Sequence, residues 1–371
     1  MLSKTLATTI ISTVVGLLSS LAVAAPSLSE PRQSVASQLV TSQPAAQQTA
    51  TSPTTKETHV DLLPAPKAET SSGAEKICAV YPHLKDSYWL SVNYGMISEA
   101  RRQGVELRVL EAGGYPNISK QASQMQLCVQ WGADAIILGT VSPDAYYNTL
   151  TQWVGSTPVF ATVNELILSE QQQQVLKGVV GVDWYQMGYD SGQFLKELHP
   201  TGSGKIDVAL LLGPTKPIAD GFYDAIESSD VNVAVSYSAD NDKELQRNFV
   251  QKVIERPDIK YIVGSAIAIE AAISELRSAN KSNKIKLVST YLSHGVYRGL
   301  LRDKVLFSPT DKMVEQGRLS VEQSIKYLRS EPYDKYAAPE IDILTPSTLR
   351  DHKITDSLSP SEFRPVFTVE P

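Results

Sequence analysis

An acidic residue and two aromatic residues stand close together in the segment "LKDSYWLSVNYGM", which runs from Leu84 to Met96: they are Asp86, Tyr88 and Trp89. A polar loop has no packing need for two adjacent aromatic side chains. Such a pair is either buried against a neighbouring segment, which is the usual fate of aromatic residues, or it lines a cleft that holds a small molecule.

Similar side chains follow other short apolar runs along the chain. With Asp86, Tyr88 and Trp89, the candidate ligand-binding residues are Tyr115, Asn164, Trp184, Tyr291 and Asp311. For any one aromatic residue, core packing is the ordinary explanation. Several of them after successive strand-like runs favour a pocket lined by aromatic rings.

A pocket of this kind prefers a particular ligand chemistry. The face of an aromatic ring is electron-rich, so several rings together attract a methylated ammonium group, which is weakly hydrated and easily transferred from water. Sugars need more Asn, Asp and Arg side chains to hold their hydroxyl groups. No Arg belongs to the candidate set, which argues against an anionic ligand in this pocket.

Motifs for other chemistries are absent or misplaced. The segment "GSGK", Gly202 to Lys205, precedes a strand-like run, so the helix N-terminus that would hold a phosphate is missing. The five histidines are far apart, no CxxC occurs, and neither a GxSxG nor an HExxH motif is present. We therefore expect no metal, no cofactor and no catalytic centre, and an exported hydrolase is the weakest of the functions considered.

The elements that must position the candidate residues show a regular order from Lys76 onward. Short runs such as "KICAVYP" and "ADAIILGT" are typical of buried strands, and the segments between them have apolar residues at helical spacing. The order repeats from "VVGVD" to "HGVYRGLLRD", and a further helix, "KMVEQGRLSVEQSIKYLRS", follows. It predicts an α/β protein of two lobes, each a doubly wound, mostly parallel sheet flanked by helices. Ligands of such sheets bind at the carboxyl ends of the strands, where the candidate residues stand.

The N-terminal part has two segments of different composition. Residues 1–24 combine an early lysine, an apolar run and the small-residue site Ala22-Val23-Ala24, which indicates a cleaved signal peptide, with an uncleaved anchor as the alternative. Residues 25–75 are dominated by Ser, Thr, Gln, Ala and Pro, a composition that predicts a disordered leader. We expect an exported protein without direct membrane insertion after cleavage.

Charge and cysteine content add further limits. The chain of 371 residues has 34 Lys and Arg against 40 Asp and Glu, and the basic residues are scattered along it, so no nucleic-acid partner is expected. Its two cysteines, Cys78 and Cys128, lie in a strand-like and a helix-like segment. They either form a disulfide, which export permits, or stay as buried free thiols.

Four segments carry a resemblance to a known family: "YPHLKDSYWLSVNYGM", "VLEAGGYPN", "GVDWYQMGYDSG" and "YLSHGVYRGL". They resemble the periplasmic sensor proteins of trimethylamine N-oxide respiration, within the periplasmic sugar-binding-protein class. Sugar-binding relatives have an Asn-Pro-Phe-Phe-like stretch at Asp86 to Trp89, an Asp at Tyr291, and Asp-Arg at Asn164 and Glu165. These departures weaken the case for a sugar and suit a small ligand with a methylated nitrogen.

The resemblance implies a type I periplasmic binding protein fold with three hinge crossovers, expected near Asn164, near Pro309 and around Tyr333 to Pro339. The expected N-terminal lobe is 76–164 plus 309–335, and the C-terminal lobe with the tail is 165–308 plus 336–371. The resemblance also implies that trimethylamine N-oxide is the ligand and that a membrane sensor histidine kinase is the partner. The oxygen of this ligand needs a hydrogen-bond donor, which is Tyr115, Tyr291 or a bound water. The alternative is a solute receptor that delivers a quaternary amine or a sugar to an ABC transporter.

Overall fold

The structure, a computed structural model, describes residues 73–371. The expected signal peptide and nearly all of the expected leader lie outside these residues. Within them, no helix is both long and apolar enough to span a membrane.

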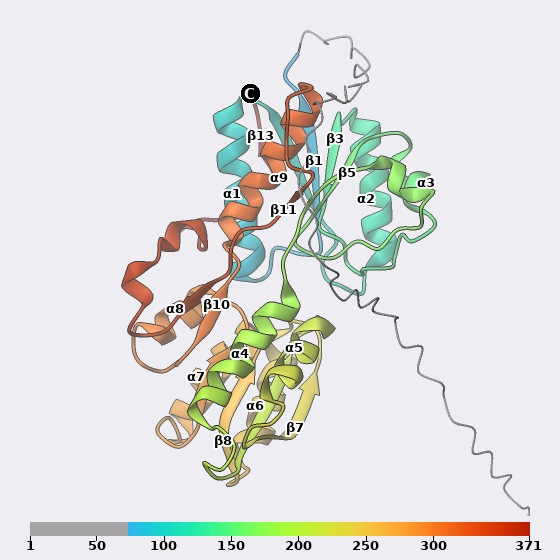
Figure 1. The fold of residues 1–371 in the computed structure, drawn as a ribbon. Helices are drawn as coiled ribbons and strands as arrows, with labels where there is room; N and C mark the ends of the chain where they lie inside the picture. Colours follow the sequence, from blue (N-terminus) through green and yellow to red (C-terminus); the bar gives the residue numbers. More distant parts are fainter. Residues whose placement is uncertain (1–72) are drawn as a thin grey trace, which may run out of the picture. The chain divides into compact units, whose positions relative to one another are not determined.

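The first sheet has seven strands in the order β11-β5-β4-β3-β1-β2-β13 (Figure 1). Its strands are β1 (Lys76–Tyr81), β2 (Glu106–Glu111), β3 (Ala135–Leu138), β4 (Val159–Thr162), β5 (Leu176–Val180), β11 (Tyr336–Ala337) and β13 (Thr368–Val369). All neighbouring strands are parallel except β13, which pairs antiparallel with β2 at one edge. The carboxyl ends of β1 to β5 therefore lie along the same edge of this sheet.

Helices cover both faces of the first sheet, since alternate residues of β1 enter different apolar clusters. Ile77, Ala79 and Tyr81 pack with α1 (Ser87–Gln103) and α9 (Met313–Leu328), whereas Cys78 packs on the opposite face. That second face is covered by α2 (Ile118–Trp131), α3 (Leu150–Val154) and the 3₁₀ helix η1 (Gln172–Val175). The buried runs of the sequence thus match a sheet between two helical layers.

Helices α1 and α9 approach each other closely through two glycines. A methyl group placed at Gly95 would lie 2.0 Å from the carbonyl oxygen of Val314, and one at Gly317 would lie 2.2 Å from the carbonyl oxygen of Val92. No side chain fits at either position, so the two backbones meet directly. This contact fixes α9, which follows the second sheet in sequence, onto the first sheet.

Cys78 of β1 and Cys128 of α2 form a disulfide, with their Cα atoms 5.7 Å apart. The sequence left open whether these residues pair or remain free thiols. The bond ties the central strand of the first sheet to the helix that covers it, and it closes a loop across 50 positions of sequence. A crosslink of this length restricts the unfolded chain and so stabilises the folded one.

The second sheet has four parallel strands in the order β7-β6-β8-β9. Its strands are β6 (Ile206–Leu212), β7 (Val231–Ser238), β8 (Ile259–Gly264) and β9 (Lys286–Ser289). Its helices pack in two groups, α4 with α5 and α6 with α7 and α8. Their bounds are α4 (Trp184–Leu198), α5 (Lys216–Ile226), α6 (Lys243–Ile254), α7 (Ala266–Ser278) and α8 (His294–Leu300).

The C-terminal segment connects elements of both sheets. After β9, a parallel bridge joins Val288 to Phe307, and β10 (Ser308–Thr310) then pairs antiparallel with β12 (Asp342–Leu344). Two 3₁₀ helices, η2 (Leu349–Asp351) and η3 (Ile354–Asp356), precede β13. The last residues therefore return to the first sheet.

The crossover expected near Asn164 is wrong, and so is the assignment of residues 165–180 to the C-terminal lobe. Strand β5 pairs with β4 in the first sheet, so the chain leaves that sheet only after Val180, at residues 181–183. Strands β11 and β13 also belong to the first sheet, although 336–371 was expected in the other lobe. Strand-helix alternation shows that a strand exists but not which sheet it joins, because pairing is a long-range contact.

Candidate functional site

The candidate site begins where α1 follows β1. Asp86 is the N-cap of α1, and its Oδ1 accepts a hydrogen bond of 3.0 Å from the backbone N–H of Trp89. This capping bond satisfies a donor that the first turn of a helix leaves free. It also places Tyr88 and Trp89 in the first turn, at the carboxyl edge of the first sheet.

Tyr88 is held by a buried hydrogen-bond network. Its hydroxyl group donates to Oδ2 of Asp311, and the same oxygen accepts from Nε2 of Gln316 over 2.8 Å. Burial raises the pKa of the Asp311 carboxyl, and the bonds from Tyr88 and Gln316 partly offset this effect. Asp311 follows β10 and Gln316 lies on α9, so the network joins α1 to the segment that returns from the second sheet.

Trp89 lies next to Tyr88 in the first turn of α1, with only 2% of its surface exposed. Its indole Nε1 lies 3.4 Å from the hydroxyl oxygen of Tyr115, to which it donates, and its ring lies 5.3 Å from that of Tyr81. The indole fits because residue 139 at the end of β3 is glycine. A methyl group there would lie 2.4 Å from Cη2 of Trp89.

The second sheet contributes two further rings. Trp184 is the first residue of α4, and Tyr291 follows β9. Both ring centroids lie 5.8 Å from that of Tyr88, and they lie 6.1 Å from each other. Aromatic pairs at these spacings and tilted angles attract each other. Tyr88 is thus the ring at which aromatic side chains from both sheets meet.

These side chains enclose a small cavity. Its lining residues are Asp86, Tyr88, Trp89, Tyr115, Val163, Asn164, Trp184, Gly213, Pro214, Thr215, Ile218, Asn241 and Tyr291. The space in which the centre of a water molecule can lie is about 20 Å³, enough for one water molecule, so a larger ligand enters only when the lining side chains move apart. None of the lining residues is Lys or Arg, and Asp86 is the one acidic side chain among them.

Seven of the eight residues expected from the sequence line this cavity: Asp86, Tyr88, Trp89, Tyr115, Asn164, Trp184 and Tyr291. Asp311 lies behind Tyr88 and is not part of the lining. Sequence reasoning missed the loop after β6, with Gly213, Pro214 and Thr215, and also Asn241 after β7. Their position after strand-like runs was a usable signal, because parallel strands present their carboxyl ends to the same site.

Burial raises the pKa values of the tyrosines at the site. Desolvation raises the pKa of Tyr115 to about 12, and the nearby Asp86 carboxylate adds to the shift. The pKa of Tyr291 is raised well above its usual value, first by burial and then by the same carboxylate. A protonated hydroxyl group can donate a hydrogen bond. Among the described residues, the Tyr291 hydroxyl is buried and has no hydrogen-bond partner.

A cavity at the carboxyl ends of two parallel sheets, with the chain passing between them, defines a two-lobed binding protein. The family model of periplasmic binding proteins and the sugar binding domain of the LacI family matches residues 74–329, and the chain belongs to this family.

Within this class, the chain is similar to the periplasmic protein TorT of Escherichia coli strain K12. The two are 44% identical over 301 residues, which cover 79% of this chain and 84% of that protein. The chain is also similar to a solved TorT, in complex with the TorS sensor domain, at 69% identity and a TM-score of 0.77. That match covers 79% of this chain and 99% of the other, and structures exist without ligand and with TMAO.

A solute binding protein of an ABC transporter from Bradyrhizobium sp. BTAi1, solved with bound bis-tris, is more distant. It is 32% identical with a TM-score of 0.69, over 81% of this chain and 91% of that chain.

The contact between Gly139 and Trp89 generates a first prediction. Gly139→Ala should displace the indole, lower the melting temperature and change the near-ultraviolet circular dichroism, while the far-ultraviolet spectrum stays the same. In a Trp89→Phe background, Gly139→Ala should lower the melting temperature by less, because phenylalanine lacks the outer indole atoms that the new methyl group would contact. Thermal melts of the four proteins form a double-mutant cycle. An equal drop in melting temperature in both backgrounds would contradict the contact between residue 139 and the indole of Trp89.

Proposed function

We propose that this protein is a periplasmic sensor that binds trimethylamine N-oxide in the aromatic cavity and reports its occupancy to a TorS-like membrane histidine kinase. The observation that carries the proposal is the cavity itself, with aromatic rings from both sheets, one carboxylate and no basic lining residue. The 69% identical TorT, solved in complex with the TorS sensor domain and with TMAO, supports the choice of ligand and partner.

The aromatic rings suit the methylated end of this ligand. Trimethylamine N-oxide has a positively polarised nitrogen that carries three methyl groups, and the faces of Tyr88, Trp89 and Trp184 supply negative electrostatic potential. Asp86 adds a negative charge at the same cavity, where its side chain is buried. In a site with little water these attractions are stronger than at an exposed surface.

The oxygen of the ligand needs hydrogen-bond donors. The hydroxyl group of Tyr88 is already engaged by Asp311, and that of Tyr115 accepts from Trp89 while its own proton is free. Tyr291 presents a buried hydroxyl group with no partner among the described residues. We assign Tyr291 as the principal donor to the ligand oxygen, with Tyr115 as the second candidate.

Ligand-linked closure provides the signal in this proposal. The two sheets with their helices act as two lobes, and the chain segments at 181–183 and 307–312 act as hinges. The backbone N–H of His294 on α8 donates to Oγ of Ser87 on α1, and Nε2 of His294 lies 2.8 Å from the carbonyl oxygen of Ser359. These contacts next to the cavity change when the lobes move, and a ligand that contacts both lobes shifts the equilibrium toward closure.

The protein is proposed to bind its ligand without transforming it, and to work in the periplasm after removal of residues 1–24. The E. coli relative is named as a periplasmic protein. The alternative function is delivery of a solute to an ABC transporter, and the similarity to a solute binding protein at 32% identity supports this alternative.

If the rings of the aromatic cavity bind the methylated nitrogen, removing one of them should weaken ligand binding. Trp184→Ala should weaken trimethylamine N-oxide binding by about 1–2 kcal/mol, and Trp184→Phe should weaken it less because a ring face remains. Trp184 is the cleaner probe because it is partly exposed, whereas Trp89 is a core residue whose truncation also leaves a destabilising void. Calorimetric titration measures both variants, with thermal melts to show that they fold. If the folded Trp184→Ala variant binds trimethylamine N-oxide with wild-type affinity, the proposal that aromatic rings bind the ligand is refuted.

The donor assignment has its own test. Tyr291→Phe keeps the ring but removes the hydroxyl group, so affinity should fall by about 10-fold, the effect of losing one hydrogen bond to a charged acceptor. The matched control is Tyr297→Phe on α8, which lies outside the cavity and should bind as wild type does. If Tyr115→Phe loses affinity and Tyr291→Phe does not, the donor is Tyr115.

Coupling to the kinase separates a sensor from a transport receptor. The isolated sensor domain of the kinase should form a complex with the mature protein and change its affinity for trimethylamine N-oxide, since coupling between two binding events is reciprocal. Size-exclusion chromatography and calorimetry with and without that domain measure both effects. An affinity that is the same in both titrations, with no complex formed, would favour the transport function.

A further inference from the structure

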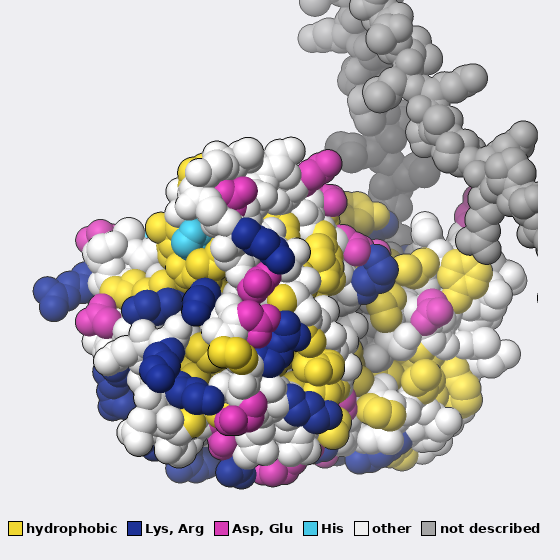
Figure 2. Space-filling model, turned by 90° about the horizontal axis from the view of Figure 1, so that it is seen from below, with side chains coloured by type: hydrophobic (Ala, Val, Ile, Leu, Met, Phe, Trp, Pro, Cys, Tyr) yellow, Lys and Arg dark blue, Asp and Glu magenta, His cyan; other side chains and the backbone are white. Residues whose placement is uncertain are grey.

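The second sheet carries a concentration of positive charge that the sequence analysis did not anticipate. Between Arg277 and Lys304 the chain has seven Lys and Arg residues and one acidic residue, Asp303, although the whole chain has a net charge of -6. Figure 2 shows many Lys and Arg side chains on one face of the molecule, with hydrophobic and acidic side chains among them. The expectation that basic residues are scattered is therefore wrong for this region.

Part of this charge surrounds a groove between α7 and α8. The groove is separate from the aromatic cavity and measures about 490 Å³ as the space open to the centre of a water molecule. Arg277 of α7, Arg298 of α8, and Arg302 and Lys304 from the turn after α8 line it, together with Ser282 and Glu270. A cavity of this size accepts a small molecule or the polar part of a larger one.

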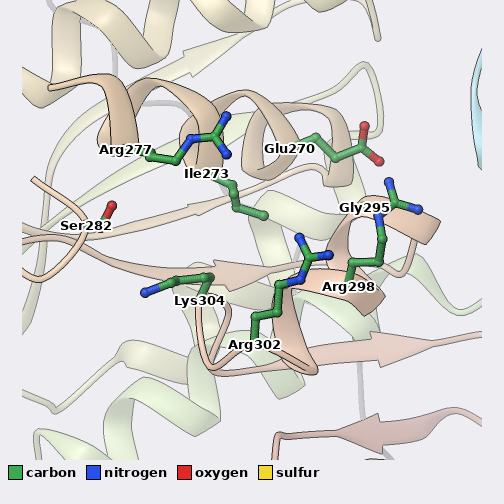
Figure 3. Close-up of a pocket in the computed structure, with 9 residues that line it drawn as sticks. Glu270, Ile273, Arg277, Ser282, Gly295, Arg298, Arg302 and Lys304 are labelled. Carbon is green, nitrogen blue, oxygen red and sulfur yellow. The ribbon is translucent and has the colours of Figure 1, made fainter. Parts of the chain in front are cut away.

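The arginine side chains of the groove extend into this space (Figure 3). In Figure 3 the guanidinium groups of Arg277 and Arg302 lie on either side of Ile273, and Arg298 extends toward Glu270, whereas Lys304 points away. Within residues 73–371, the side chains of these four basic residues make no hydrogen bond or ion pair. The one carboxylate of the groove, Glu270, accepts a hydrogen bond of 2.6 Å from Oγ of Ser293.

Neighbouring guanidinium groups repel one another unless an anion lies between them. A guanidinium group presents a planar fork of donors that matches the oxygens of phosphate or carboxylate. A carboxylate offers two oxygens and is satisfied by a single fork. A tetrahedral phosphate offers oxygens in several directions, which fits arginines that approach from α7, from α8 and from the turn after it.

We propose that the groove between α7 and α8 is a binding site for a phosphate group, held mainly by Arg277 and Arg302 with Arg298 at its rim. This site is independent of the aromatic cavity and of its ligand. The phosphate group has two available sources, free phosphate and the headgroup of an anionic phospholipid. Leu301, next to Arg302, has 56% of its surface exposed, so an apolar side chain is available beside the groove for contact with lipid.

The experiment uses the mature protein at constant ionic strength maintained with sodium chloride. Inorganic phosphate is titrated by calorimetry, and phosphatidylcholine vesicles with and without phosphatidylglycerol are tested by flotation. We expect wild type to bind phosphate or the phosphatidylglycerol vesicles. Arg302→Gln and Arg277→Gln should each weaken the observed binding by about 10-fold, which corresponds to one lost charge-assisted hydrogen bond.

The matched control is Arg101→Gln, an exposed arginine at the end of α1 on the first sheet, which lowers net charge equally and should bind as wild type does. Binding to phosphatidylglycerol vesicles alone would identify a lipid headgroup as the source, and binding of inorganic phosphate would identify the free ion. The proposal is overturned if wild type binds neither, if Arg101→Gln weakens binding as much as Arg302→Gln, or if citrate binds more tightly than phosphate.

Discussion

The geometry of the candidate site depends on the hydrogen bond between Tyr88 and Asp311. Tyr88 is the ring that Trp184 and Tyr291 of the second sheet both contact, so its position sets where those rings meet the first sheet. Asp311 comes from the segment that returns from the second sheet, and Gln316 of α9 holds the same carboxylate. A buried polar group without partners costs free energy, so these bonds favour the observed position of Tyr88, although Oδ1 of Asp311 and Oε1 of Gln316 have no partner among the described residues.

The surrounding packing makes that arrangement rigid on the side of the first sheet. Gly95 and Gly317 let α1 and α9 meet backbone to backbone, and the Cys78–Cys128 disulfide fastens α2 to the opposite face of the same sheet. The second sheet and its helices supply the other side of the cavity, through Trp184, Tyr291, Ile218, Asn241 and the loop from Gly213 to Thr215. Because both lobes line the cavity, a ligand that contacts both would favour the closed arrangement in the proposed sensor.

Charge is distributed differently at the two proposed ligand sites. The aromatic cavity has one carboxylate and no basic side chain, so it favours the positive end of a small dipolar molecule. The groove between α7 and α8 has four basic side chains and one carboxylate that is already hydrogen-bonded. Opposite electrostatic preferences keep the two ligands from competing for one site.

The sequence by itself determined the elements and the chemistry of the main cavity. Alternation of buried runs with amphipathic segments depends on local periodicity, so the run "KICAVYP" matches β1 and "KMVEQGRLSVEQSIKYLRS" matches α9. Seven of the expected binding residues line one cavity, because parallel strands bring their carboxyl ends together whatever their order.

Tertiary structure alone decided which sheet each strand joins and which distant side chains contact the site residues. Strand β5 joined the first sheet instead of opening the second. Asp311 accepts the hydrogen bond of Tyr88 although the two are 223 positions apart in sequence, and Arg277 and Arg302 line one groove although they belong to different elements. Pairing and convergence of this kind depend on contacts between distant segments, which local periodicity does not encode.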